Sequence, residues 1–148
     1  MHTDGTSTAR QQLSNLLEGL LKKAPGTTGA LLGSGDGLKL AFTQQSNDHA
    51  DSLAAVISGL YSLGRQQFKD AAGGIRQVVV EHDAGSLFVM SAGARFTDDR
   101  AVNTVLAVVA AADADPGQVG YEMETFIGGL AEHLVVQARP NSFGGSGR

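Results

Sequence analysis

Residues 28–41 read Thr28-Gly-Ala-Leu-Leu-Gly-Ser-Gly-Asp-Gly-Leu-Lys-Leu-Ala41 and decide the fold. Two short apolar runs are joined here by Gly33-Ser-Gly-Asp-Gly37. Glycine adopts positive φ without a steric penalty, and the side chains of Ser34 and Asp36 can bond back to the local backbone. The stretch therefore predicts a tight β-hairpin with strands near Thr28–Leu32 and Leu38–Thr43.

An amphipathic helix is predicted on the N-terminal side of this hairpin. From Arg10 onward, leucines recur at helical spacing, at Leu13, Leu16, Leu17, Leu20 and Leu21. Pro25 and Gly26 are expected to end the helix. Residues 1–9 are mostly polar, and we expect them to form a flexible N-terminus.

A long helix is predicted on the C-terminal side, from Ser46 or Asp48 to about Lys69. Ser46-Asn-Asp48 offers N-cap side chains, and Ala71-Ala-Gly-Gly74 provides a stop. One apolar row on this helix is expected to face the sheet: Leu53, Val56, Ile57, Leu60 and Leu63. Beside it runs a row of small residues: Ala55, Ser58, Gly59 and Ser62.

The second half of the chain returns to strands. Ile75–His82 and Ser86–Ser91 flank the turn Asp83-Ala-Gly85 and predict a second hairpin. The apolar run 104–111 fits a strand or a buried helix, and its valines favour a central strand. Asp115-Pro-Gly-Gln118 starts a last helix with an apolar face of Met123, Phe126, Ile127, Leu130 and Leu134. Residues 139–148 are expected to be a flexible tail.

Composition indicates one globular domain and excludes several classes. The chain has 148 residues, 42% of them hydrophobic, and a net charge of −4. It has no cysteine, which excludes disulfides and thiolate metal sites. The negative charge and 5% aromatic content argue against a nucleic-acid partner. We see no signal-peptide core or membrane span, so a cytoplasmic protein is the expectation.

The predicted order is α-β-β-α-β-β-β-α. Short hairpin links make a five-stranded, mostly antiparallel sheet. Strands such as Ile75–His82 read as largely apolar on both sides, which is typical of a sheet covered on both faces. We therefore predict an α/β (α+β) fold, a three-layer α/β/α sandwich.

This order and the first hairpin resemble the Roadblock/dynein light-chain family. Bacterial members carry a Ser-x-Asp-Gly-Leu-x-x-Ala type hairpin, which Ser34, Asp36, Gly37, Leu38 and Ala41 match. The resemblance extends over about residues 10–136, and we predict one Roadblock-like domain of residues 10–138. It implies a dimer in which the third strands pair edge to edge and the middle helices lie side by side. It also implies a Ras-like small GTPase as partner, and a histidine-kinase-like protein as a further one.

The chain has features that suit such a dimer. Ile75–His82 is predicted to be an edge strand, and a long apolar edge is an aggregation hazard if it stays open. We expect the dimer interface to contain Ala55, Ser58, Gly59, Ser62, Ile75, Gln77 and Val79. The alternative is that the small residues only fit against the chain's own sheet. Candidate partner contacts are Tyr61, Arg65 and Phe68.

Signals for catalysis are weak. Gly33–Gly37 lacks the Gly-Lys-Ser/Thr ending of a P-loop and precedes a strand, so it is better explained as a turn. The four histidines show no metal-ligand spacing, and no metal or cofactor is expected. Asp98, Asp99, Arg95 and Arg100 lie in a predicted loop, where Arg95 is the least implausible arginine finger. The leading hypothesis is thus a non-catalytic dimeric adaptor for a Ras-like GTPase. The alternative is a small-ligand sensory domain, which would need a polar interior cavity.

Overall fold

The computed structural model describes residues 3–34, 36–43, 45–92 and 104–130. In chain order the elements are α1 (Thr3–Lys23), β1 (Thr27–Ser34), β2 (Lys39–Phe42), α2 (Asn47–Gln67), β3 (Gln77–His82), β4 (Gly85–Ser91) and β5 (Thr104–Ala111). A further helix occupies residues 116–130. The predicted element order is confirmed over these residues.

The five strands form one sheet in the order β2-β1-β5-β4-β3. Every neighbouring pair is antiparallel, as the hairpin links require. The run 104–111 is the central strand and is buried along most of its length, which resolves the strand-or-helix alternative in favour of a strand. β2 and β3 are the two edges, so the expectation of an edge at residues 75–82 is confirmed.

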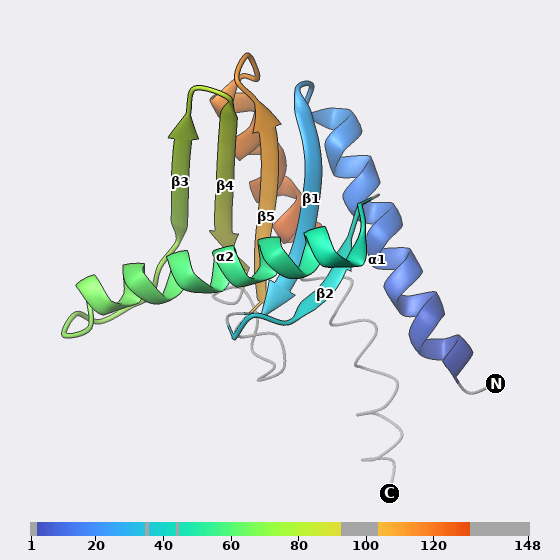
Figure 1. The fold of residues 1–148 in the computed structure, drawn as a ribbon, viewed down its shortest axis with the longest axis horizontal. Coiled ribbons are helices and arrows are strands. Elements are labelled where there is room, and N and C mark those ends of the chain that lie inside the picture. Colours follow the sequence, from blue (N-terminus) through green and yellow to red (C-terminus); the bar gives the residue numbers. More distant parts are fainter. Residues whose placement is uncertain (1–2, 35, 44, 93–103, 131–148) are drawn as a thin grey trace, which may run out of the picture.

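Helices cover both faces of the sheet, which confirms the three-layer architecture (Figure 1). On one face, α1 and helix 116–130 enclose the larger apolar core, whose members include Leu17, Leu20, Leu32, Leu106, Val108, Met123 and Ile127. On the other face, α2 crosses the strands over a smaller core that includes Leu31, Ile57, Val89, Val105 and Ala107.

The first hairpin is stabilised by the turn chemistry that its sequence predicts. The Gly37 N–H donates to the Ser34 carbonyl at 3.1 Å, and Gly37 has a φ of 95°. The Ser34 hydroxyl contacts the Asp36 carboxylate and accepts from the Leu38 N–H at 3.1 Å. The register shifts between Leu32 and Gly33, which marks a bulge next to the turn.

The caps of the later helices also follow the sequence. The Ser46 hydroxyl accepts from the His49 N–H at 3.0 Å and caps α2. The Asp115 carboxylate accepts from the Gly117 N–H at 3.0 Å at the start of helix 116–130. Gln118 links this helix to α1, because its amide nitrogen donates to the Lys23 carbonyl at 3.3 Å.

One helix boundary differs from the prediction. α1 begins at Thr3 rather than near Arg10, because its first turns are polar and give no apolar periodicity to detect. The expected tail 139–148 and Leu134 lie outside the described residues.

A candidate interface on helix α2 and the edge of β3

The sheet-facing row of α2 matches the row that the sequence predicts only in part. Its buried residues are Ala50, Ala54, Ile57 and Tyr61. Of the five apolar residues expected there, Ile57 alone is buried, and Val56 and Leu63 are 50% and 71% exposed. Leu53 and Leu60 are half-buried and pack with Ile57 against the smaller core, so the expectation is confirmed for these three residues. It is wrong for Val56 and Leu63, because Ala50, Ala54 and Tyr61 complete the sheet-facing side of the helix instead.

Tyr61 belongs to this core rather than to an exposed flank. Its side chain is 8% exposed, and its hydroxyl donates to Ser91 Oγ on β4 at 3.2 Å. A contact between Tyr61 and a partner stays a prediction, and only 8% of this side chain is open to such a contact. Arg65 remains exposed, with its guanidinium carbon 5.5 Å from the centroid of the Tyr61 ring, and Phe68 is 63% exposed.

The four small residues of α2 differ from one another in their surroundings. Ala55, Gly59 and Ser62 are exposed. A Cβ added at Gly59 would meet no atom within 4 Å, so no close contact within the described chain explains this glycine. Ser58 is half-buried and lies against the first hairpin, since a Cβ added at Gly37 would sit 3.7 Å from Ser58 Cβ.

A second helical glycine has a packing reason inside the chain. A Cβ added at Gly64 would lie 3.0 Å from Cδ1 of Ile75, so the glycine makes room for this side chain. Ile75 packs against the smaller core just before β3 begins at Gln77. Of the candidate dimer residues, Ile75 is thus half-buried, whereas Gln77 and Val79 are exposed on β3.

The edge of β3 is long and apolar, whereas the edge of β2 is short. β2 spans the four residues Lys39–Phe42, and Lys39 forms an ion pair with Asp51 of α2. β3 has six residues, and its valines Val79 and Val80 are 39% and 40% exposed. An open strand of this kind presents unpaired backbone groups to a partner strand.

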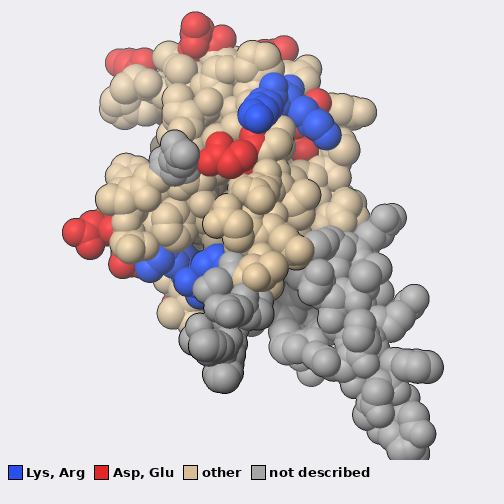
Figure 2. Space-filling view, turned by 90° about the vertical axis from the view of Figure 1, so that its right-hand side faces the viewer, with Lys and Arg blue, Asp and Glu red and all other residues tan. Residues whose placement is uncertain are grey.

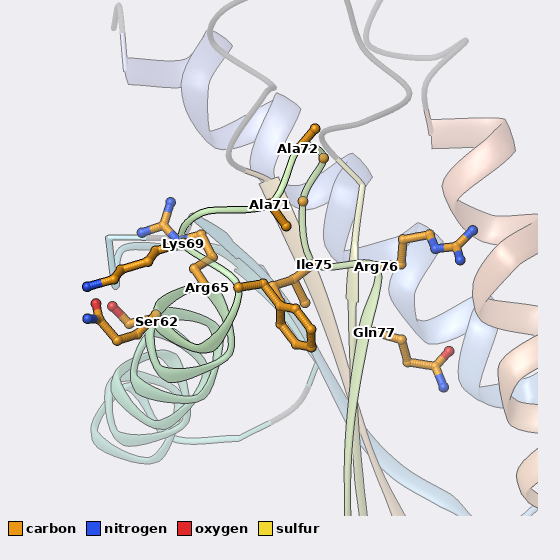
Figure 3. Close-up of a pocket in the computed structure, with 12 residues that line it drawn as sticks. Ser62, Arg65, Lys69, Ala71, Ala72, Ile75, Arg76 and Gln77 are labelled. Carbon is orange, nitrogen blue, oxygen red and sulfur yellow. The ribbon is translucent and has the colours of Figure 1, made fainter.

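An open hollow lies where α2 ends and the chain returns to the sheet (Figure 3). Arg65 and Lys69 line it from the helix side, whereas the side chains of Arg76 and Gln77 extend to the other side of the strand (Figure 3). The hollow is a surface feature and not the enclosed polar cavity that a small-ligand sensor needs.

The described residues show no candidate metal centre. No group of three or more His, Cys, Asp or Glu side chains in this part of the chain could hold a metal ion. His82 Nδ1 accepts from the Ala84 N–H at 2.9 Å in the β3–β4 turn. Arg95, Asp98, Asp99 and Arg100 lie outside the described residues. None of the described helices is long and apolar enough to cross a bilayer.

The face that carries α1 and β2 shows no continuous basic surface. Figure 2 shows its Lys and Arg side chains in small separate groups, with uncharged and acidic side chains between them. A nucleic-acid-binding face typically carries a basic patch or stripe. This face therefore differs from such a surface.

The family model of the Roadblock/LC7 domain matches residues 13–110. The chain belongs to the Roadblock/LC7 family. Among solved structures, a Roadblock/LC7 domain from Streptomyces avermitilis is 40% identical, with a TM-score of 0.72 over 82% of this chain and 97% of that chain. No protein in a search of curated proteins matches.

Two more distant solved structures share the fold. MglB from Myxococcus xanthus is 18% identical, with a TM-score of 0.70 over 83% of this chain and 94% of that chain. The gliding protein MglB from Thermus thermophilus is 21% identical, with a TM-score of 0.68 over 83% of this chain and 88% of that chain. At these identities the likeness concerns the fold alone.

Proposed function

We propose that this Roadblock/LC7 chain is a non-catalytic dimeric adaptor that binds a Ras-like small GTPase and modulates its nucleotide cycle in the cytoplasm. The observation that carries the proposal is the apolar outer face of α2 beside the open edge of β3. Val56 and Leu63 on the helix and Val79 and Val80 on the strand are all substantially exposed. Apolar side chains gathered at one side of a domain are typical of a protein–protein contact.

The position of α2 on the sheet supports a two-fold dimer. Figure 1 shows α2 crossing the strands near one end of the sheet and projecting beyond β3. The other end of this face is left open, and it carries Val80 and the half-buried Leu87 and Val109. A two-fold axis through β3 would place the second α2 over this open end, because rotation exchanges the two ends of the sheet.

The same dimer gives Gly59 a packing role. Glycine in a helix interior costs about 1 kcal/mol relative to alanine, and the described chain offers no close neighbour that requires it. Two α2 helices that approach across the axis would bring their Gly59 positions together with Ala55 and Ser62. Small residues at a helix crossing allow a short interaxial distance.

The GTPase part of the proposal rests on membership of the family and on the surface left free by the dimer. Arg65 and Phe68 are exposed near the end of α2, and both residue types are enriched at interfaces. A histidine-kinase-like protein is a further partner that the family resemblance implies. One solved MglB structure with this fold has a tetrameric arrangement, which supports assembly beyond a single copy.

Two measurements test the proposal. Multi-angle light scattering of the purified full chain should give twice the monomer mass of 15.2 kDa at micromolar concentration. A pulldown with a Ras-like GTPase from the same genome, loaded with GDP or a non-hydrolysable GTP analogue, should show binding that differs between the two states. A monomer at high concentration would overturn the dimer. A dimer that binds the GTPase in neither state would overturn the adaptor role.

A further inference from the structure

The backbone groups of β3 alternate between its own sheet and the open edge. The Arg76 carbonyl accepts from the Ser91 N–H of β4 at 3.1 Å, just before β3 begins. β3 pairs with β4 without interruption, from Gln77 opposite Met90 to His82 opposite Gly85. Because alternate residues of an antiparallel strand bond to the same neighbour, the even-numbered residues bond to β4. Gln77, Val79 and Glu81 therefore direct their N–H and C=O groups to the open edge.

Symmetry restricts how two such edges can pair. In the proposed dimer, both α2 helices lie on the same face of the joined sheet. A β3 side chain that points to this face must therefore lie opposite a side chain of the partner strand that points to the same face. Successive side chains alternate between faces, so odd-numbered residues must oppose odd-numbered ones. The two-fold axis must then pass beside a residue and not between two residues. The residues near the middle of β3 beside which the axis could pass are Val79 and Val80.

Hydrogen bonding favours the axis at Val79. In that register the three outward-directed residues pair among themselves, with Val79 opposite its own copy and Gln77 opposite Glu81. These pairs supply about six inter-strand hydrogen bonds, two for each hydrogen-bonded pair. With the axis at Val80, Gln77 would face Asp83, which lies in the turn after β3, and about four bonds would remain.

The side chains favour the same register. With the axis at Val79, valine meets valine at the centre, Val78 meets Val80 on the α2 face, and Gln77 meets Glu81 on the other face. With the axis at Val80, the Glu81 carboxylate would face the Val79 side chain. Cross-strand pairs of like polarity stabilise a sheet, whereas a carboxylate opposite a valine loses hydration without a compensating bond.

Charge gives this register a specific contact. Arg76 and Gln77 extend to the side of the sheet away from α2, and Glu81 shares the face of Gln77 by strand alternation (Figure 3). Neither Arg76 nor Glu81 forms an ion pair within the described part of the chain. Glu81 of a second copy would lie opposite Gln77 and therefore next to Arg76. Because of the two-fold symmetry, the dimer would contain two such Arg76–Glu81 pairs.

We infer that the dimer axis passes beside Val79, so that each Glu81 lies opposite Gln77 of the partner copy and pairs with its Arg76. The inference rests on the proposed dimer and adds its register. A second copy of this chain then occupies the β3 edge. The arginine–carboxylate contact favours this register over the alternative registers of the two strands.

Disulfide trapping separates the two registers, because the natural chain has no cysteine. Val79→Cys and Val80→Cys are a matched pair, since the two valines are 39% and 40% exposed. Opposed residues of a hydrogen-bonded pair have Cα atoms about 5.5 Å apart, which a disulfide spans. Val80 and its copy would be offset diagonally by roughly 7–8 Å or more, which a disulfide does not span without backbone movement.

Under mild oxidation of the full chain, Val79→Cys should form a cross-linked dimer on a non-reducing gel and Val80→Cys should not. Cross-linking of Val80→Cys in place of Val79→Cys would overturn the register and retain the dimer. Failure of both, with a dimer mass by light scattering, would overturn pairing through β3. Failure of both with a monomer mass would overturn the proposed dimer itself.

Charge reversal tests the Arg76–Glu81 contact. Arg76→Glu and Glu81→Arg should each weaken the dimer roughly tenfold, because each places like charges together at two symmetric positions. The double variant exchanges the charges and should restore the dissociation constant to within about threefold of the natural chain. Sedimentation at low salt measures these constants. Single variants without effect, or a double variant that is weaker than either, would overturn the contact.

Discussion

The Tyr61 hydroxyl of α2 donates a hydrogen bond to Ser91 Oγ of β4 at a distance of 3.2 Å. The Tyr61 side chain is 8% exposed, and Arg65 covers its ring from the solvent side at 5.5 Å. This bond fixes the C-terminal half of α2 to the sheet close to the edge strand. The orientation of α2, and so the set of residues it exposes, depends on this contact.

Tyr61→Phe should lower the free energy of unfolding by about 1 kcal/mol, because it removes one part-buried hydrogen bond and leaves the ring in place. Tyr61→Ala should lower it by about 3–5 kcal/mol, because it also empties a buried site. Urea unfolding at one fixed protein concentration measures both. Phe68→Ala is the control, and it should change stability little because that ring is 63% exposed. A Tyr61→Ala variant as stable as this control would show that Tyr61 is not in the core.

The sequence predicts most of the fold because its turns carry specific chemistry. Gly37 with its positive φ, the Ser34 side chain and the Ser46 cap all act locally, so their effects are visible in a short stretch of sequence. Local signals of this kind place the strands within a few residues. The start of α1 was missed because a polar helical turn has no such signal.

The rotation of α2 could not be predicted from the sequence. The helix carries two apolar rows at the same spacing, one with Ala54 and Ile57 and one with Val56 and Leu63. Hydrophobicity alone gives no reason to prefer the first row for the sheet, yet Ala54 and Ile57 are the residues buried against Leu31, Val89 and Val105. The presence of two rows indicates that one of them is left exposed, and it could have drawn attention to Val56 and Leu63.

Gly59→Glu should convert the dimer into a folded monomer. The added side chain has open space within the chain, since no atom lies within 4 Å of the Cβ position, so the fold should tolerate it. In a helix-to-helix contact the same carboxylate would be buried without a partner, which costs several kcal/mol. Light scattering gives the mass, and far-ultraviolet circular dichroism checks the fold.

Gly19→Glu is the matched control for this variant. Gly19 also lies in a helix with no atom within 4 Å of its Cβ position, but it is on α1, which covers the opposite face of the sheet. This variant should remain a dimer. If Gly59→Glu also remains a dimer, the two helices do not meet at residue 59.

Arg65→Ala and Phe68→Ala should each weaken binding to the GTPase at least about fivefold, because truncation of an anchor residue at an interface costs more than about 1 kcal/mol. Both residues are exposed, so the dimer mass and the fold should not change. Calorimetric titration with the loaded GTPase measures the affinity. Gln67→Ala, an exposed position on the same helical turn, is the control. Equal affinity for all three variants and the natural chain would place the GTPase on another surface.

Gly59→Ala should stabilise the folded monomer and weaken the association of two copies. Within one copy, alanine adds helix propensity without a clash, so the monomer should gain about 1 kcal/mol of stability. Between two copies, the added methyl groups would widen the helix crossing, and the dissociation constant should rise roughly tenfold. Urea unfolding at a concentration well below that constant measures the first effect, and sedimentation equilibrium measures the second. Gly19→Ala should show the gain in stability alone. A Gly59→Ala chain that is both more stable and more tightly dimeric would mean that the glycine does not lie at the contact between helices.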